Sequence, residues 1–262
     1  MPGPDLPLLI EAAHAAGEVA RGYFRNSPRQ WEKEAGAGPV TEADLAVNDR
    51  LEQVLRAARP GYGWLSEESP DDPARLDAAR SFVVDPIDGT RAFIDGQDSF
   101  SHALAVVEGG RVVAGVVYLP MRQALYAASA DGPATLNGAP IRPSGQAAAP
   151  GATVLTSRPS LDPGHWRGGQ VPPIERAFRP SIAWRICLVA EGRFDAALSF
   201  RPAWDWDIAA AALIAERAGA RVSDARGAAL RFDRTSAQND GLLIAPPDLH
   251  GDLLGRMALT WP

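Results

Sequence analysis

The sequence predicts a mixed fold of the α+β or α/β class, built of layered sheets and helices. Strand-like runs follow one another in the first half of the chain, whereas strands and helices alternate in the second half. Apolar residues also recur at helical spacing close to the N-terminus. A length of 262 residues allows either one large domain or two tightly joined halves.

Two amphipathic helices are expected at the start of the chain. The first covers residues 6–24, where apolar side chains recur at helical spacing. The second starts at Thr41, because Thr41 and Asp44 have the spacing of a capping box. Between the two helices, the polar and glycine-rich residues 26–39 are expected to form a mobile loop, and a short extended piece is expected within residues 60–68.

A sheet is expected in the middle of the chain. It begins with a short buried strand at residues 82–84, where the apolar period changes. Glycine turns and apolar runs then predict an antiparallel meander, with strands at residues 103–107, 112–118 and 125–128.

A segment rich in Pro, Ala and Gly, residues 142–151, marks the predicted boundary between two halves. We expect an N-terminal α+β half in residues 1–145 and a C-terminal α/β half in residues 146–262, packed as one compact unit. The second half is expected to contain helices at residues 182–191 and 207–218 and strands at residues 154–156, 194–199, 221–223 and 241–245.

Charge and composition argue against several kinds of partner. The net charge is −6 and the basic residues are scattered, so we expect no binding to a nucleic acid polymer or to an anionic membrane. The N-terminus lacks the basic region of a signal peptide, and no apolar run approaches the about 18 residues of a membrane span. The single cysteine, Cys187, lies in an apolar run and is expected to be buried. We therefore expect a soluble, cytoplasmic protein.

Carboxylates and a glycine follow the buried strand at residues 82–84. Asp85 and Asp88 stand three residues apart, and the intervening Pro86 bends the chain so that both side chains can turn towards one point. Gly89 and Thr90 open a short helix, whose first amides would attract phosphate. Such a set suits divalent cations that bridge to a phosphate. The alternative is a structural one, with Asp88 as the N-cap of a helix that follows a strand.

Two known acidic motifs do not fit this segment. Phosphatases with an aspartyl nucleophile carry two aspartates two residues apart, but Pro86 occupies that position here. An EF-hand loop needs acidic residues at alternate positions before its glycine, which are also missing.

Further acidic residues stand at the ends of other predicted elements. Glu67 and Glu68 follow the short extended piece, where a solvated pair is the alternative interpretation. Asp205 and Asp207 precede a predicted helix and are flanked by tryptophans, which would shield the carboxylates from water at a cost unless a cation compensates. The alternative for Asp207 is a simple helix N-cap.

Together these segments resemble the inositol monophosphatase family of metal-dependent, lithium-sensitive phosphatases, over about residues 6–245. The resemblance implies a layered α-β-α-β-α sandwich and a homodimer. The segments that carry it are Lys33, Pro39-Val40-Thr41-Glu42-Ala43-Asp44, Ser66-Glu67-Glu68-Ser69, Asp85-Pro86-Ile87-Asp88-Gly89-Thr90, Trp206-Asp207-Ile208-Ala209-Ala210 and Ala218-Gly219-Ala220.

The resemblance also implies residue roles. Two or three Mg²⁺ ions would be bound by the ligand set Glu67, Asp85, Asp88, Asp207 and the carbonyl of Ile87. Asp44 and Thr90 would orient and deprotonate an attacking water, with Glu67 as a further catalytic residue. Phosphate and substrate would be held by Asp88, Gly89, Thr90, Arg91 and Asp205.

Departures from the family pattern fall where the leaving group of the substrate would be held. Arg91 stands where members often carry Thr or Lys, and Pro180-Ser181 replaces a common Gly-Ser pair, which makes Ser181 a further candidate. Glu68 and Lys33 are candidates as well. Lys33 is the single lysine of the chain and matches a family lysine, although chance explains one lysine too.

We therefore expect a Mg²⁺-dependent phosphomonoesterase that acts on a small polyol phosphate such as inositol 1-phosphate. The alternatives with the same chemistry are a 3′(2′),5′-bisphosphate nucleotidase and a histidinol phosphatase. A relative that binds phosphorylated ligands without catalysis would lack an acidic residue or Thr90, and all of them are present.

Overall fold

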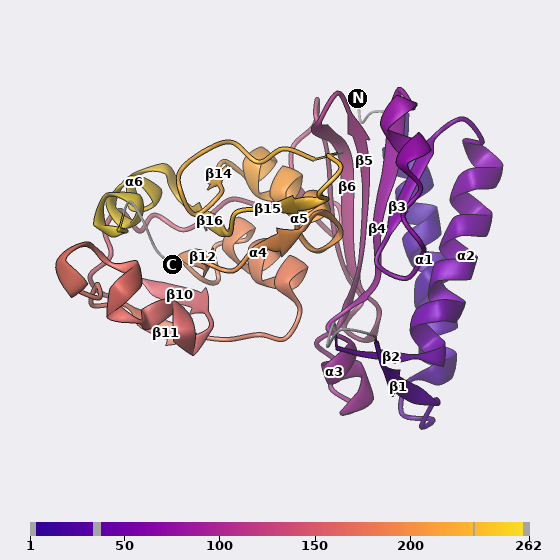
Figure 1. Cartoon of the computed structure of the whole chain (residues 1–262), viewed down its shortest axis with the longest axis horizontal. Helices are drawn as coiled ribbons and strands as arrows, with labels where there is room; N and C mark the ends of the chain where they lie inside the picture. Colours follow the sequence, from indigo (N-terminus) through magenta and orange to yellow (C-terminus); the bar gives the residue numbers. More distant parts are fainter. Residues whose placement is uncertain (1–3, 34–37, 233, 259–262) are drawn as a thin grey trace.

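Layers of helices and sheets alternate along the long axis of the molecule. The computed structural model describes residues 4–33, 38–232 and 234–258. Two helices, a seven-stranded sheet, two further helices, a five-stranded sheet and a last helix follow one another across the molecule (Figure 1). The predicted α-β-α-β-α order is therefore confirmed.

The seven-stranded sheet is formed by residues 63–140. β3 is parallel to β4, and the other neighbouring strands in it are antiparallel, which confirms the predicted meander. In spatial order its strands are β3 (Gly63–Ser66), β4 (Arg80–Asp88), β5 (Ser101–Glu108), β6 (Arg111–Leu119), β7 (Ala124–Ser129), β8 (Thr135–Leu136) and β9 (Ala139–Pro140).

The strand β4 is longer than predicted, and this decides where its acidic residues lie. Asp85 pairs with Ala103 and Asp88 pairs with Ser101, with an irregularity of the register between them. The two aspartates therefore belong to the strand itself, and the chain bulges at Pro86.

Both faces of this sheet are buried. Phe82, Val84 and Leu104 pack towards α1 (Leu6–Tyr23) and α2 (Glu42–Ala58). The alternate residues of the same strands, which include Val83 and Ala105, pack towards α4 (Ile182–Ala190) and α5 (Asp205–Ala218). Because both faces are covered, the strands read as continuous apolar runs in the sequence.

The N-terminus of α2 has the predicted capping box. The Thr41 side chain accepts a hydrogen bond from the Ala43 amide, and the Asp44 carboxylate accepts one from the Thr41 amide. The same residue pair therefore ends the preceding strand, starts the helix and fixes the Asp44 side chain.

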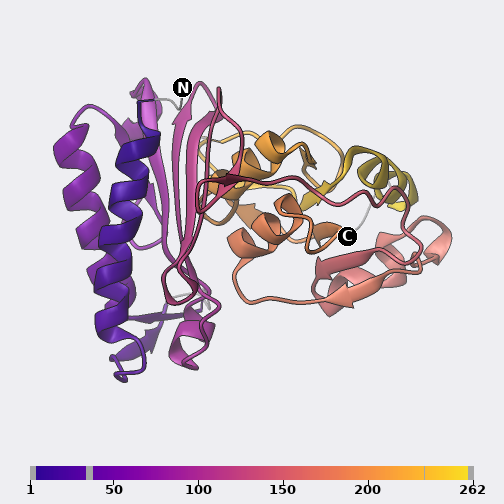
Figure 2. The same ribbon diagram turned by 180° about the vertical axis from the view of Figure 1, so that it is seen from behind.

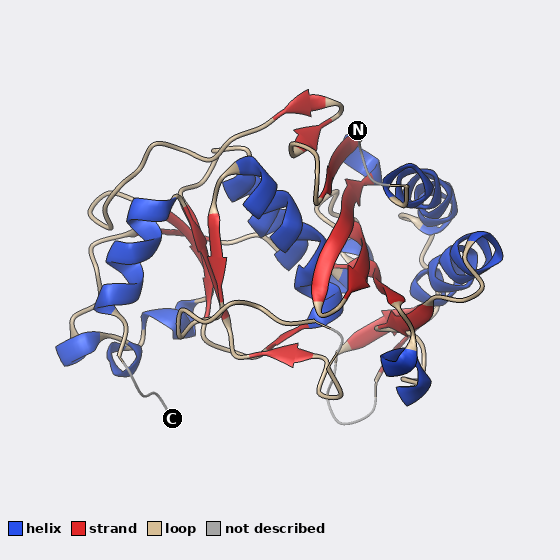
Figure 3. Ribbon diagram, turned by 90° about the horizontal axis from the view of Figure 1, so that it is seen from above, coloured by secondary structure: helices blue, strands red, loops and turns tan. Residues whose placement is uncertain are grey.

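The second sheet has the order β11-β10-β12-β16-β14. Helices α4 and α5 fill the space between the two sheets, and α6 (Pro247–Arg256) packs on the outer face of the second one (Figure 3). Its strands are β10 (Thr153–Thr156), β11 (Glu175–Ala177), β12 (Ala196–Ser199), β14 (Arg221–Ser223) and β16 (Leu242–Ala245).

Several short elements differ from expectation. The expected loop at residues 26–39 contains paired strands, β1 (Gln30–Glu32) and β2 (Pro39–Thr41), whereas residues 34–37 lie outside the described part of the chain. Helix α5 begins at Asp205 rather than at Asp207, and α6 was not predicted. The remaining short elements are β13 (Ala203–Trp204), β15 (Gln238–Asn239), α3 (Thr90–Ile94), η2 (Pro73–Asp77), η3 (Pro120–Arg122), η4 (Arg158–Leu161), η5 (Pro163–His165) and η6 (Arg167–Gly169).

The chain passes from the first sheet to the second through residues 141–152, a segment that runs along the molecule in Figure 2. The division that we propose after residue 145 falls within it. Helices α4 and α5 share one core with both sheets, since Val83 and Leu155 belong to the same apolar cluster. Among the described residues, no helix has the length and apolarity to cross a membrane. Cys187 is buried and forms no disulfide, as expected.

Candidate active site

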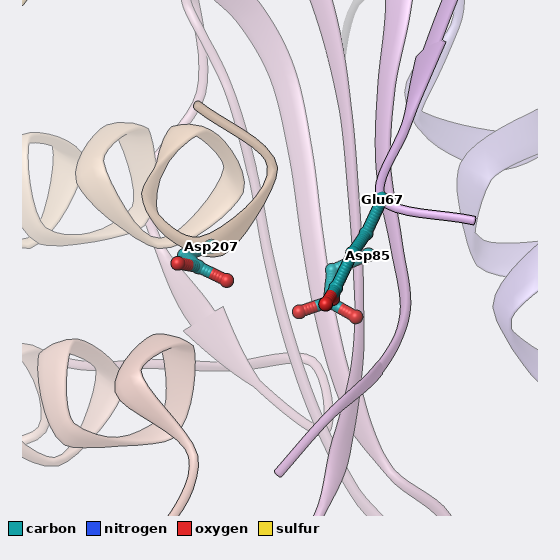
Figure 4. Close-up of side chains that lie close together, drawn as sticks. All are labelled: Glu67, Asp85 and Asp207. Atoms are coloured by element: carbon teal, nitrogen blue, oxygen red, sulfur yellow. The ribbon is translucent and has the colours of Figure 1, made fainter. Parts of the chain in front are cut away.

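Three carboxylates from separate elements meet in the middle of the molecule. The parallel pairing of β3 with β4 places Ser66 beside Val84, so the next residues, Glu67 and Asp85, are neighbours where β3 ends. Asp207, in the first turn of α5, faces them from the helix side (Figure 4). One oxygen of each carboxylate lies within 4.8 Å of the others. The sequence-predicted residues Glu67, Asp85 and Asp207 are thus brought together.

Asp85 is the most deeply placed of these acidic residues. Both of its carboxylate oxygens are buried without a hydrogen-bond partner. Burial, and then the charges of Glu67 and Asp88, raise the pKa of Asp85 well above its usual range. Burial, and then the charges of Asp88 and Glu67, also raise the pKa of Asp207 well above its usual range. An ionised carboxylate in this position is costly unless a cation compensates its charge.

The donor set therefore fits a hard divalent cation. Mg²⁺ binds carboxylate and carbonyl oxygens and retains several waters, so it needs few protein ligands. The two unpartnered oxygens of Asp85 and the nearby oxygens of Glu67 and Asp207 provide that chemistry.

Asp88 is engaged differently from these three residues. Its carboxylate accepts hydrogen bonds from the Ser181 hydroxyl at 2.6 Å and from the amides of Ile182 at 3.1 Å and Ala183 at 2.7 Å. Burial raises the pKa of Asp88 to about 6, although these hydrogen bonds oppose the rise. Asp88 thus ties β4 to the N-terminus of α4, where an anion is stabilised by the helix amides. Ser181 itself is the N-cap of α4.

Asp44 and Thr90 form a hydrogen-bonded pair. The Thr90 hydroxyl lies 3.1 Å from Asp44 Oδ1 and 3.2 Å from the carbonyl of Ile87. The other carboxylate oxygen of Asp44 accepts bonds from the Thr41 amide and hydroxyl at 2.8 and 2.6 Å. Burial raises the pKa of Asp44 above its usual range. The Thr90 hydroxyl thus contacts both the Asp44 carboxylate and the carbonyl of Ile87.

Lys33 is bound to the neighbouring glutamates. Its ammonium donates to Glu67 Oε1 at 2.7 Å and to Glu68 Oε1 at 2.6 Å. Burial raises the pKa of Glu68 to about 7, despite the hydrogen bond from Lys33. The Glu68 side chain is only 6% exposed, so the alternative of a solvated glutamate pair does not hold.

Gly89 and Arg91 flank Thr90 at the start of α3. Gly89 has a φ of 100°, a left-handed conformation that favours glycine, and it is the N-cap of α3. Arg91 is exposed and lines a surface pocket together with Trp31 and Asp95. Among the described residues, Arg91 forms no ion pair with Glu67, Asp85 or Asp207.

Asp205 does not belong to the group of three carboxylates. It is fully buried, and its carboxylate accepts a hydrogen bond from the Asn239 side chain at 2.9 Å, which ties α5 to β15. The flanking Trp204 and Trp206 stack on each other with ring centroids 4.6 Å apart, and Trp204 remains 41% exposed. Asp205 thus joins the start of α5 to β15, and its expected contact with the substrate stays a prediction.

Sequence reasoning missed two residues beside the site. His102 is buried next to the bulge of β4, where its Nδ1 bonds the carbonyl of Pro86, and burial lowers its pKa to about 4. Arg185 lies in the first half of α4, close enough for its charge to interact with those of Asp88 and Asp207. One signal was available for Arg185, because a lone charge interrupts the apolar run of residues 182–190.

Similar proteins agree with this architecture. An inositol-1-monophosphatase of Rhizobium meliloti is 32% identical over 85% of this chain and 86% of the relative. A 3′(2′),5′-bisphosphate nucleotidase, CysQ, of Salmonella typhimurium is 33% identical over 91% of this chain and 98% of the relative. The extragenic suppressor protein SuhB of Bartonella henselae has a solved structure with a TM-score of 0.83 and 25% identity, which covers 97% of this chain and 98% of that one.

Fold, acidic group and relatives together define a metal-dependent phosphatase, a hydrolase of phosphoric monoesters. The family model of the inositol monophosphatase family matches residues 4–258. The chain belongs to the inositol monophosphatase family, which confirms the resemblance found in the sequence. Members of this family are typically Mg²⁺-dependent and act on small phosphorylated substrates.

Proposed function

We propose that this protein hydrolyses a small polyol phosphate, with inositol 1-phosphate as the first candidate, by attack of a water on phosphorus. The observation that carries the proposal is the buried Asp85 carboxylate, which has no hydrogen-bond partner and shares its surroundings with Glu67 and Asp207. When ionised, such a group is stabilised by a bound cation, and a cation beside a phosphate is the basis of this hydrolysis.

Two or three Mg²⁺ ions are proposed, held by the ligand set Glu67, Asp85, Asp207, Asp88 and the carbonyl of Ile87. The hydrogen bonds that Asp88 accepts from α4 leave carboxylate lone pairs for a further contact, because each oxygen carries two. Bound ions would lower the pKa of the attacking water and offset the negative charge of the phosphate.

Thr90 and Asp44 are proposed to orient and deprotonate that water. The Thr90 hydroxyl donates to Asp44 Oδ1, so its oxygen can accept a hydrogen bond from the water while a proton passes on to Asp44. The raised pKa of Asp44 makes its carboxylate a better base than an exposed aspartate. The water oxygen bonds to phosphorus as the bond to the leaving oxygen breaks, the leaving oxygen takes a proton from solvent, and inorganic phosphate and an alcohol are released.

Binding of the phosphate is assigned to the amides of Gly89 and Thr90 at the start of α3, next to Asp88. Lys33 and Glu68 are proposed to hold Glu67 in place, since the Lys33 ammonium bridges both glutamates. Arg91 and Asp205 are also proposed to contact the substrate. Homodimer assembly, inhibition by lithium and a cytoplasmic location remain predictions.

A 3′(2′),5′-bisphosphate nucleotide is the second candidate substrate. Similarity to the Salmonella nucleotidase is as high as similarity to the Rhizobium inositol enzyme and extends over more of the chain. Histidinol phosphate is the third compound to compare, because its hydrolysis uses the same chemistry.

The proposal is tested by phosphate release from these three substrates by the full-length protein, with Mg²⁺ or with EDTA. We expect Mg²⁺-dependent release from at least one of them, and kcat/KM then ranks the substrates. A protein that releases no phosphate from any of them, or releases it equally in EDTA, would refute the proposal.

A further inference from the structure

Arg185 is a cation on the otherwise apolar helix α4, and its guanidinium is fixed by the backbone before that helix. Its Nε donates to the carbonyl of Arg179, and its Nη2 donates to the carbonyl of Pro180 at 3.0 Å. The guanidinium carbon also lies 4.2 Å from the centroid of the Phe178 ring. These contacts define both the position and the plane of the guanidinium, so its rotamer entropy is already lost.

The guanidinium lies at the N-terminal end of α4, the end of the helix that binds Asp88. The Asp88 carboxylate accepts hydrogen bonds from the amides of Ile182 and Ala183 at the start of the same helix, about one turn before Arg185. Burial lowers the pKa of Arg185, and the charges of Asp88 and Asp207 oppose that shift. No ion pair within 4.0 Å involves Arg185 among the residues that the structure describes.

One nitrogen of the guanidinium therefore remains able to donate hydrogen bonds to a ligand. Its Nη1 makes no hydrogen bond to any residue in the described part of the chain, and it is not among the buried atoms without a partner. Cations held by the acidic group would offset the charges of Asp88 and Asp207, which would then no longer compensate that of Arg185. A fixed, partly buried guanidinium with a free donor edge then suits an anion, above all a phosphate.

We infer that Arg185 binds a second phosphate group, on the leaving-group part of the substrate, and thereby selects a bisphosphate over a monophosphate. This inference rests on the proposed function. The phosphate that is hydrolysed has its own amides at Gly89 and Thr90, the N-cap and first residue of α3, whereas Arg185 belongs to α4, whose first amides bind Asp88. Inositol 1-phosphate has no second phosphate, so the inference favours the bisphosphate nucleotide.

The test compares substrates that differ only in the second phosphate. Adenosine 3′,5′-bisphosphate and adenosine 3′-monophosphate are hydrolysed by the full-length wild-type protein and by Arg185→Gln, with Mg²⁺. For the bisphosphate we expect Arg185→Gln to lower kcat/KM at least about tenfold, mainly by raising KM. A tenfold change corresponds to about 1.4 kcal/mol. For the monophosphate we expect less than about a twofold change, because it lacks the group that Arg185 binds.

Matched variants control for charge and folding. Arg193→Gln removes the same charge beyond the other end of α4, where Arg193 is 59% exposed, and should leave both substrates unchanged. Arg185→Lys should restore part of the activity on the bisphosphate, because it keeps the charge without the planar donors. The Tm of each variant shows whether it is folded.

Three outcomes would overturn the inference. These are an equal fall of kcat/KM for both nucleotides, no fall for either, and a wild-type protein that hydrolyses inositol 1-phosphate but neither nucleotide. The last outcome leaves the proposed function intact. If no substrate released phosphate, the proposed function would fail, and calorimetric binding of the two nucleotides to wild type and Arg185→Gln would still decide the role of Arg185.

Discussion

Replacement of Glu68 by Gln is expected to stabilise the metal-free protein, and to do so more at high pH. Burial raises the pKa of Glu68 from 4.5 to about 7, so the folded state holds its proton more tightly than the unfolded state. At about 1.36 kcal/mol per pKa unit, the ionised side chain costs about 3 kcal/mol of stability at pH 8 and about 1.4 kcal/mol at pH 5.5. Because the folded pKa is raised, this cost appears as the pH rises through the interval between the two pKa values.

Glu68→Gln removes this charge and keeps an oxygen for Lys33, which also retains its bond to Glu67. Relative to wild type, the variant should gain about 2 kcal/mol more stability at pH 8 than at pH 5.5. For a chain of this size that corresponds to about 4–8 °C in Tm. Thermal unfolding in EDTA, followed by circular dichroism at both pH values, measures the difference.

A matched control is Glu52→Gln, which removes one carboxylate from an exposed pair with Arg56 on α2. Such pairs contribute about 0.5 kcal/mol or less, so little change is expected at either pH. The reasoning about Glu68 is refuted if Glu68→Gln lowers the Tm at pH 8, or if its gain is the same at both pH values.

Two further predictions concern the neighbours of the acidic group. Thr90→Val removes the hydroxyl that donates to Asp44 and should lower kcat at least about 100-fold, whereas Thr90→Ser should retain most of it; equal rates for both variants would contradict the role of the hydroxyl. Ser181→Ala removes the N-cap of α4 and one donor to Asp88, and should cost about 1–2 kcal/mol, measured by urea unfolding; an unchanged transition would contradict this contact.

Local signals in the sequence predicted much of the fold. The capping box of α2 and the buried run before Asp85 depend on neighbouring residues, so they could be interpreted without any tertiary information. The paired strands β1 and β2 have three residues each, too few to show a period of two, and their pairing was missed.

Long-range contacts explain why the acidic site was predicted less completely. The bond from Asp88 to the Ala183 amide joins residues 95 positions apart, and no spacing in the sequence indicates it. The choice between Asp205 and Asp207 depends on the first turn of α5, where one side chain is buried against Asn239 and the other faces the acidic group. Arg185 was overlooked because an apolar helix does not reveal which neighbour its one charged residue faces.

Calorimetric titration of Mg²⁺ into wild type and Asp85→Asn, with phosphate release measured on the same samples, tests the central claim most directly. Asp98→Asn, which alters an exposed salt bridge with Arg122, is the matched control. We predict saturable Mg²⁺ binding and Mg²⁺-dependent activity in wild type and Asp98→Asn, and loss of the activity with at least about tenfold weaker binding in a folded Asp85→Asn. Unchanged Mg²⁺ binding and activity in Asp85→Asn would contradict the account.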